Sequence, residues 1–273
     1  MEWSKAKKYT IIILVILNIV LLSFNVYKSF ETRLSSIRIN AVTSLLLSKD
    51  ITIVSTLPRS YKPMADIVVS ENVFDYIKLE KIFMEGQNNI RRTDEYNSVV
   101  FISDNSRLAI KGSIINFTSD YGREINNEAE AKAYAQKLID RINDDFGRYT
   151  FYSLYKTSDG YSVKFYEKTD NHNIFSNFAY FTIRGSNIAL ALNYVKIGNE
   201  LSEKNNIYAA DEALYSAANL IAEENEKPNI SNVELGYYAI KSSTGNESIA
   251  TPFYLIIANG KEYYVNAYTG ECF

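Results

Sequence analysis

Residues 9–26 read YTIIILVILNIVLLSFNV, an uncharged stretch of 18 residues close to the N-terminus. As a helix it extends about 27 Å, which is close to the roughly 30 Å hydrocarbon core of a bilayer. Tyr9 and Tyr27 flank the stretch, at the positions where aromatic side chains favour the membrane interface. The stretch therefore predicts a transmembrane helix over residues 9–27.

The charges on either side of this helix predict its orientation. Residues 1–8 hold three lysines and one glutamate, for a net charge of +2, in addition to the amino terminus. Residues 28–33 hold two basic residues and one acidic residue, for a net charge of +1. The positive-inside rule then predicts a cytoplasmic tail over residues 1–8 and an extracytoplasmic domain over residues 28–273. The chain is expected in the cell membrane as a single-pass protein.

A cleaved signal peptide is the alternative interpretation, because it also begins with a basic segment. Its apolar region would be shorter than this one, and small residues would mark the cleavage site. Residues 23–26 read SFNV and contain no A-x-A pattern. These features favour an uncleaved anchor.

Two asparagines interrupt the apolar stretch. Asn18 and Asn25 are seven residues apart and therefore lie on nearly the same face of a helix. Leu14, Leu21 and Leu22 flank that line. Because an asparagine inside a membrane can hydrogen-bond a neighbouring helix, these five residues are the candidate surface for transmembrane helix packing. The alternative for Asn25 is a position at the membrane interface, where it contacts no helix.

The composition predicts a folded, sheet-rich domain. Hydrophobic residues make up 47% and charged residues 22% of the chain, as in ordinary globular proteins. Tyrosines outnumber phenylalanines, 22 to 14, and tyrosine suits strands with one buried and one wet face. The net charge of −3 and the scattered basic residues argue against a nucleic-acid partner.

The first half of the outer region predicts a mixture of elements. The periodicity and turn residues indicate an amphipathic helix over 31–47, a short strand over 51–54, a helix or strand over 73–84, and a strand pair over 98–102 and 107–117 with a turn at 104–106.

The second half predicts a helix followed by antiparallel strands, twice. Helices are expected over 128–144 and 209–224, with strands over 149–156, 161–168, 178–184 and 188–196 after the first and over 233–242, 252–258 and 262–268 after the second. Several residues also align at an offset of 72, such as Phe165-Tyr166 with Tyr237-Tyr238.

The predicted fold class is therefore α+β, with one transmembrane helix and an outer domain of two related helix-plus-antiparallel-meander subdomains. The expected divisions after the helix are a membrane-proximal α+β region over 28–123, a first subdomain over 124–200 and a second over 201–273.

The search for chemistry finds no catalytic, cofactor-binding or metal-ligating motif. His172 is the single histidine and falls in a polar loop, where a solvated residue is expected. Cys272 is the single cysteine, so an intramolecular disulfide is excluded, and it lies next to the C-terminus, where chains usually fray. The pairs Asp144-Asp145 and Glu223-Glu224 are expected at solvated helix ends. No glycine-rich phosphate loop is present. These observations predict a protein that is not an enzyme.

The N-terminus resembles a known family. The tract EWSKAK at residues 2–7, followed by an apolar span with Ile16-Leu17-Asn18, is similar to the start of YycI (WalI) proteins. The resemblance continues in order along the chain, through LLL at 45–47, ITI at 51–53, LP at 57–58 and YYVNAYTGE at 263–271.

This resemblance implies a regulatory role in Gram-positive bacteria. YycI proteins act with a related partner, YycH, on the membrane histidine kinase YycG (WalK) of the YycFG (WalRK) two-component system, which governs cell-wall metabolism. It implies one membrane helix, an extracytoplasmic α+β domain, and control of the kinase partly through transmembrane helices. A cell-wall ligand of the outer domain is compatible with this role.

Two other functions stay open from the residues. The strand–turn ending is similar to that of PepSY-type domains, which implies an extracellular protease inhibitor or chaperone as the alternative. A membrane-anchored cell-wall enzyme is the least favoured hypothesis, because His172 is the single histidine.

Overall fold

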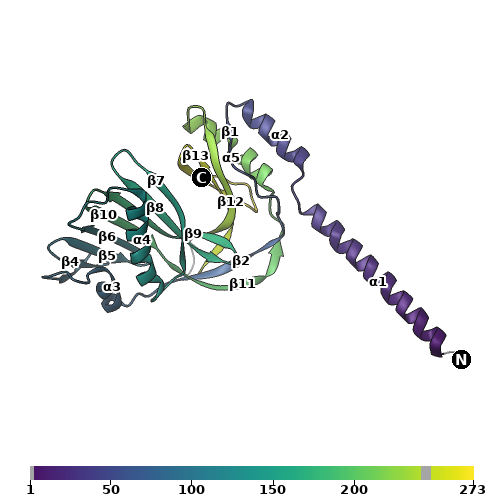
Figure 1. Cartoon of the computed structure of the whole chain (residues 1–273), viewed down its shortest axis with the longest axis horizontal. Helices are drawn as coiled ribbons and strands as arrows, with labels where there is room; N and C mark the ends of the chain where they lie inside the picture. The colour runs from purple at the N-terminus through teal and green to yellow at the C-terminus, as the bar shows by residue number, and fades with distance from the viewer. Residues whose placement is uncertain (1–2, 241–246) are drawn as a thin grey trace. The chain divides into compact units, whose positions relative to one another are not determined.

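The structure is a computed structural model that describes residues 3–240 and 247–273 (Figure 1). Within these ranges the helices are α1 (Trp3–Glu31), α2 (Ser36–Leu47), α3 (Tyr76–Phe83), α4 (Glu128–Asn143) and α5 (Ala210–Glu224). The strands are β1 (Thr52–Ile53), β2 (Met64–Glu71), β3 (Arg91–Glu95), β4 (Ser98–Ile102), β5 (Ser106–Lys111), β6 (Ile114–Asp120), β7 (Tyr149–Lys156), β8 (Tyr161–Thr169), β9 (His172–Arg184), β10 (Asn187–Asn193), β11 (Val195–Asn205), β12 (Asn229–Ile240), β13 (Glu247–Ala258) and β14 (Lys261–Asn266).

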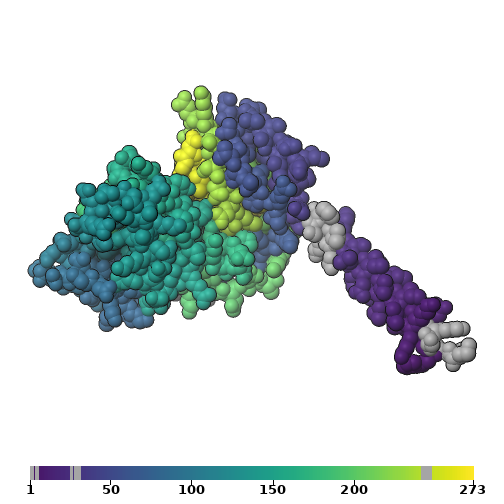
Figure 2. Space-filling model, viewed as in Figure 1, coloured from purple at the N-terminus to yellow at the C-terminus, as the bar shows by residue number. Residues whose placement is uncertain are grey.

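The N-terminal helix α1 is long and apolar. Its segment Ala6–Phe24 has 19 residues and a mean hydropathy of 1.9, and none of its most apolar stretch is buried. The side chains of this segment form the surface of α1 in the space-filling view (Figure 2). Among the described residues it is the only helix long and apolar enough to cross a membrane. By length and composition it fits a membrane anchor or a signal sequence.

The rest of the chain is an α+β domain built on an open sheet. The strand order is β11-β2-β13-β12-β9-β10-β6-β5-β4-β3, and β1, β7, β8 and β14 branch from this path. The edge strands β11 and β3 are rich in exposed charged residues. Charged edges disfavour the addition of a strand from another chain. The predicted α+β class is confirmed at this level.

An apolar core lies between one face of the sheet and the helices α3 and α4. A row of buried side chains runs across five paired strands, because residues directly paired on neighbouring strands point to the same face. α4 packs on β7 and β8, and α3 packs on α4 (Figure 1). The row consists of Leu108, Phe117, Leu190, Phe181 and Val163.

Most predicted elements are confirmed apart from their ends. The helices predicted over 128–144 and 209–224 correspond to α4 and α5. The segment 73–84 is a helix, α3, because the Asp75 side chain accepts hydrogen bonds from the N–H groups of its first turn. The last two residues of the strand predicted over 233–242 lie outside the described residues.

Three predicted elements were wrong in their extent. The strand 107–117 is two strands, because Gly112 adopts a positive φ of 54° and turns the chain between β5 and β6. The strand 188–196 is split at Tyr194, where β10 ends and β11 begins. The helix 31–47 is broken at residues 32–35, because that segment forms backbone hydrogen bonds with residues 59–61 instead.

The contacts divide the chain into two compact units, each made of separate stretches. One unit holds Met1–Met64, Asn205–Glu234 and Ile256–Phe273, and the other holds Ala65–Lys204 and Leu235–Leu255. Strands β12 and β13 contribute residues to both units. The division at residues 123/124 and 200/201, and the relationship between the two predicted subdomains, stay predictions.

Replacing Phe165 by alanine is expected to destabilise the fold. Phe165 is fully buried and its ring packs edge-on against Phe151 and Phe181. The substitution leaves a cavity and should lower the free energy of unfolding by about 3–5 kcal/mol in urea denaturation. Tyr96→Ala is the control, because Tyr96 is 98% exposed. Equal losses for the two variants would contradict the assigned core.

Candidate functional site

Three polar side chains of α1 bond to the backbone of their own helix. The Thr10 hydroxyl donates to the Ala6 carbonyl at 2.9 Å, and the Ser23 hydroxyl donates to the Ile19 carbonyl at 2.8 Å. The Asn18 side-chain N–H donates to the carbonyl one turn earlier, at Leu14, at 2.9 Å. Such bonds satisfy polar groups where water is absent, so α1 is compatible with a hydrocarbon environment.

Asn18 keeps hydrogen-bonding capacity after this bond. A side-chain amide has two N–H groups and a carbonyl oxygen, and the bond to Leu14 uses one N–H. Within the described residues Asn18 makes no other side-chain hydrogen bond. Its second N–H and its Oδ1 atom are therefore free to bind a neighbouring helix.

The predicted packing residues lie together on this side of α1. At 100° per residue, Leu14, Leu21 and Leu22 are within about 60° of Asn18, and all three are more than half exposed. The fifth predicted residue, Asn25, has a side chain outside the described set. The contact of this face with another helix stays a prediction.

The chain leaves α1 along a short backbone ladder. The Leu34 N–H donates to the Arg59 carbonyl at 2.7 Å, and the Tyr61 N–H donates to the Thr32 carbonyl at 3.0 Å. The Leu34 side chain is 2% exposed. The segment between α1 and α2 is thus bonded to a second segment of the same unit.

Helix α2 then packs on α5. The Ser35 hydroxyl accepts from the Arg38 N–H at 3.3 Å and begins the helix. Val42 and Leu46 are the buried residues of α2, and they are four apart, on one face. At the end of α2, Lys49 donates to the side-chain oxygen of Asn219 on α5 at 2.9 Å.

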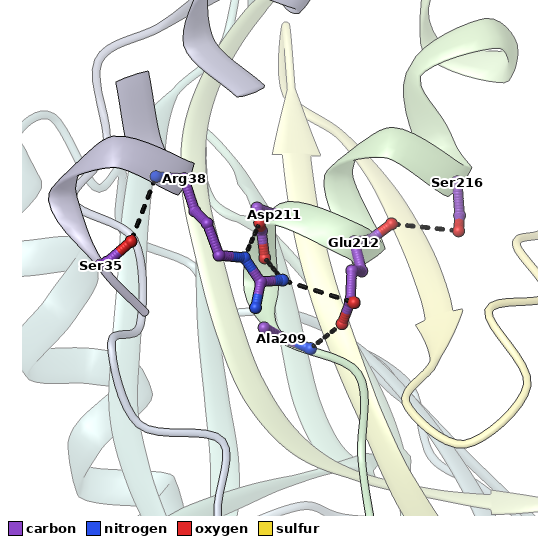
Figure 3. A network of polar contacts seen from close by, with 6 residues as sticks. All are labelled: Ser35, Arg38, Ala209, Asp211, Glu212 and Ser216. Carbon is purple, nitrogen blue, oxygen red and sulfur yellow. Dashed lines mark hydrogen bonds and ion pairs between the residues drawn. The ribbon is translucent and has the colours of Figure 1, made fainter. Parts of the chain in front are cut away.

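An ion-pair network joins the start of α2 to the start of α5 (Figure 3). Both Nε and Nη2 of Arg38 donate to the carboxylate of Asp211, each at 2.7 Å. Nη2 also lies 3.4 Å from Oε1 of Glu212. The Asp211 side chain is only 12% exposed, and Arg38 is 37% exposed. We call Arg38, Asp211 and Glu212 the Arg38 clamp.

The clamp is held in place by the first turn of α5. The second carboxylate oxygen of Glu212 accepts from the Ala209 N–H at 2.7 Å, so Glu212 caps the helix while it faces Arg38. The hydrogen bonds to Asp211 are the main reason that the pKa of Arg38 is raised. Two carboxylates at a helix N-terminus are also favoured by the helix dipole.

The single histidine is part of a strand. The turn before it consists of Asp170 and Asn171, both with positive φ, and His172 is the first residue of β9. Its ring is half-buried and packs edge-on against Tyr237, with 5.9 Å between the centroids. The expectation of a solvated loop residue was wrong, because β12 runs beside the start of β9.

The C-terminus is held in place by backbone bonds. The Phe273 N–H donates to the Tyr264 carbonyl at 3.0 Å, and the Tyr264 N–H donates to the Phe273 carbonyl at 2.9 Å. Cys272 pairs with Val265. Burial raises the pKa of the Cys272 thiol to about 11, which disfavours the reactive thiolate. The expectation of a frayed end was wrong, since β14 pairs with the last residues.

The carboxylate pairs at the ends of α4 and α5 form ion pairs with lysines. Asp145 accepts from Lys78 at 2.7 Å, and Glu224 accepts from Lys261 at 2.5 Å. Glu224 also forms a hydrogen bond with the Tyr263 hydroxyl, and its charge adds to the raised pKa of Cys272. Over residues 3–240 and 247–273, no three His, Cys, Asp or Glu side chains are grouped to hold a metal ion.

One buried carboxylate, Glu167, belongs to no sequence motif. Glu167 is 7% exposed, and its Oε2 accepts from the side-chain N–H of Asn177 at 2.6 Å. Burial raises its pKa, more than the bonds from Asn177 and the Arg148 N–H lower it. Glu167 stands where the pairing of β8 with β9 shifts in register. Glu167 follows Val163 and Phe165 at a spacing of two residues, and both of these face the core. This spacing predicts that Glu167 is on the same buried face.

Breaking the Arg38 clamp is expected to loosen α2. Asp211→Asn should lower the free energy of unfolding by about 1–2 kcal/mol, because the bidentate bonds weaken while partial exposure of Arg38 screens the pair. Hydrogen exchange of residues 36–47 should become faster. In a double-mutant cycle, Arg38→Met and Asp211→Asn should be strongly non-additive. Lys137→Met is the control, because it removes an exposed positive charge from the other unit. Additive effects at Arg38 and Asp211 would disprove the coupling.

Glu167→Gln is expected to stabilise the fold increasingly as pH rises. Folding raises the pKa of Glu167, so the folded state favours the neutral carboxyl. The stability that this gives is fully present below the unfolded pKa of about 4.3. It is lost as pH rises through the folded pKa. Glutamine cannot ionise, so the Tm difference from the parent should grow between pH 4 and 7.

Glu224→Gln is the matched control of opposite sign. The hydrogen bond from Lys261 lowers the pKa of Glu224, so its contribution is present above the unfolded pKa and lost as pH falls. Its substitution should be least harmful at low pH. A pH-independent effect of Glu167→Gln would contradict the burial of a charge there.

No family model matches the chain, and no curated protein matches it. A crystal structure of an uncharacterized protein from Eubacterium rectale ATCC 33656 is similar, with a TM-score of 0.53 and 11% identity over 82% of this chain and 90% of that chain. The Bacillus megaterium YpeB C-terminal domain has a TM-score of 0.39 and 10% identity over 73% of this chain and 95% of that chain. The first similarity shows that this fold is shared with a solved structure.

Proposed function

We propose that this chain is a non-enzymatic, membrane-anchored regulator of a cell-wall-sensing histidine kinase, and that it acts with a YycH-like partner. The observation that carries the proposal is the exposed face of α1, where Asn18 retains free hydrogen-bonding groups among leucines. The YycI-like tract EWSKAK at residues 2–7 supports it. In this proposal α1 crosses the cell membrane once, with the N-terminus in the cytoplasm.

The outer domain carries the extracytoplasmic contacts in this proposal. It comprises a membrane-proximal region and two related helix-plus-meander subdomains, over 124–200 and 201–273. The kinase and the YycH-like protein are the expected partners, and a cell-wall ligand could bias their association. None of these contacts requires chemistry at His172 or Cys272.

The physical requirement on such a regulator is modest. It must bind one arrangement of the kinase's transmembrane helices more tightly than another. Asn18 meets this requirement, because its free N–H and Oδ1 gain a hydrogen bond only when a partner helix places a polar group opposite them. Interhelical bonds of this kind contribute about 0.5–2 kcal/mol, enough to shift a balanced equilibrium severalfold.

The Arg38 clamp links this helix to the folded domain. α1 ends at Glu31 and α2 begins at Ser36, so only four residues separate them. The backbone ladder to Arg59 and the ion pair to Asp211 restrain these residues. A partner that shifts α5 would therefore move the exit of α1 as well.

Asn18→Leu is expected to weaken association with the kinase or the YycH-like partner in a membrane two-hybrid assay. The substitution keeps the helix apolar and removes the free amide groups. Ser23→Ala is the matched control, because Ser23 also bonds back to the helix but lies about 140° away around the axis. An unchanged signal for Asn18→Leu, or an equal loss for both variants, would remove Asn18 from the contact.

A deletion strain carrying a wall-hydrolase reporter tests the function itself. Loss of a kinase regulator should change kinase-dependent expression, and the full chain should restore it. The alternative, a PepSY-like protease inhibitor or chaperone, would leave the reporter unchanged and alter extracellular protease activity. Peptidoglycan turnover by the purified chain would support an enzyme and contradict the proposal.

A further inference from the structure

Three cations gather where the chain leaves α1. Arg33 and Ser60 form an antiparallel bridge, which brings Arg33 beside the segment that carries Arg59 and Lys62. All three residues are exposed. In the described parts of the chain none of the three forms an ion pair with a carboxylate. We call Arg33, Arg59 and Lys62 the exit cations.

The charge around the exit cations differs from that of the whole chain. Residues 32–64 hold five basic residues and one acidic residue, for a net charge of +4, whereas the chain carries −3. The remaining residues therefore carry −3 − 4 = −7. Arg38 is neutralised by Asp211 within the clamp, but the exit cations are not. The excess positive charge is concentrated just after α1.

The distance along α1 places these cations near the level of lipid phosphates. The apolar segment ends at Phe24 and α1 continues to Glu31, which adds about 10 Å at 1.5 Å per residue. The headgroup layer of each leaflet is roughly 5–8 Å thick. Long basic side chains reach back several ångströms toward it.

An apolar side chain accompanies the cations. Ile37 is in the first turn of α2, four residues after Arg33, and is 83% exposed. Interfacial segments combine basic and apolar side chains in this way, since the cations attract phosphates and the apolar groups enter the acyl boundary. The exposed cations and the exposed Ile37 side chain therefore both favour contact with a lipid surface.

We propose that the exit cations and Ile37 form a surface that binds the phosphates of anionic phospholipids in the leaflet where α1 emerges. The proposal rests on the membrane anchoring in the proposed function and adds a lipid partner to it. Lipid binding would restrain residues 32–62 at the membrane surface. The lipid composition would then change the distance between residues 32–62 and the bilayer. The Arg38 clamp would transmit this change to α5.

Fluorescence quenching of the full chain in nanodiscs tests the proposal. The parent variant is Cys272→Ser with Ile37→Cys, labelled with a dye and placed in discs that contain a headgroup-level quencher lipid. Quenching should be severalfold greater in phosphatidylglycerol-containing discs than in pure phosphatidylcholine discs. It should fall as salt rises, since exposed charges are screened.

Charge variants identify the cations responsible. Arg33→Gln, Arg59→Gln and Lys62→Gln together should reduce the quenching in anionic discs to the phosphatidylcholine level. The matched control combines Lys111→Gln, Lys137→Gln and Lys168→Gln, which removes the same charge from exposed positions elsewhere, and it should keep the quenching. Equal quenching in both lipids, or no effect of the first set, would overturn the lipid surface.

A second dye position separates this proposal from the anchoring. With the dye at Leu22→Cys in α1, an acyl-chain quencher should act in both kinds of disc. Quenching at position 22 without lipid dependence at position 37 would refute the lipid surface and leave the regulator intact. Absence of quenching at position 22 would refute the anchor, and with it the proposed function.

Discussion

The bidentate pair between Arg38 and Asp211 links the region that follows α1 to the folded domain. Besides this pair, α2 buries Val42 and Leu46, and Lys49 after its end donates a hydrogen bond to the Asn219 side chain on α5. The pair is effective because Asp211 is almost buried and sits at a helix N-terminus, where negative charge is favoured. The backbone ladder to Arg59 and the pair to Asp211 together restrain residues 32–38.

A different constraint, strand register, organises the core beneath α3 and α4. The rows of buried side chains across β5, β6, β10, β9 and β8 require strict register, because a shift by one residue would turn every apolar side chain outward. At Glu167 that register changes, and β8 buries a carboxylate in line with its own core residues Val163 and Phe165. The hydrogen bond from Asn177 partly offsets the burial of this charge.

Local signals were sufficient where an element is long and periodic. The stripes of α4 and α5 and the uncharged length of α1 were all readable from residue spacing, and so was the α+β class. The ends of helices and strands were harder to predict. Gly112 turns the chain within a segment whose pattern predicts one strand. Residues 32–35 leave the predicted helix and bond to residues 59–61. Each of these departures depends on a partner segment that spacing does not reveal.

The face of α1 that carries Asn18 follows from the sequence alone, because a helix puts residues three, four and seven apart on one side whatever surrounds it. The Arg38 clamp does not, since its partners are 173 positions apart and belong to different helices. Neither does the composition of the two units, each of which joins distant stretches. The sequence determines periodicity, length and charge, whereas the approach of distant segments is decided by packing and hydrogen bonding in the folded chain.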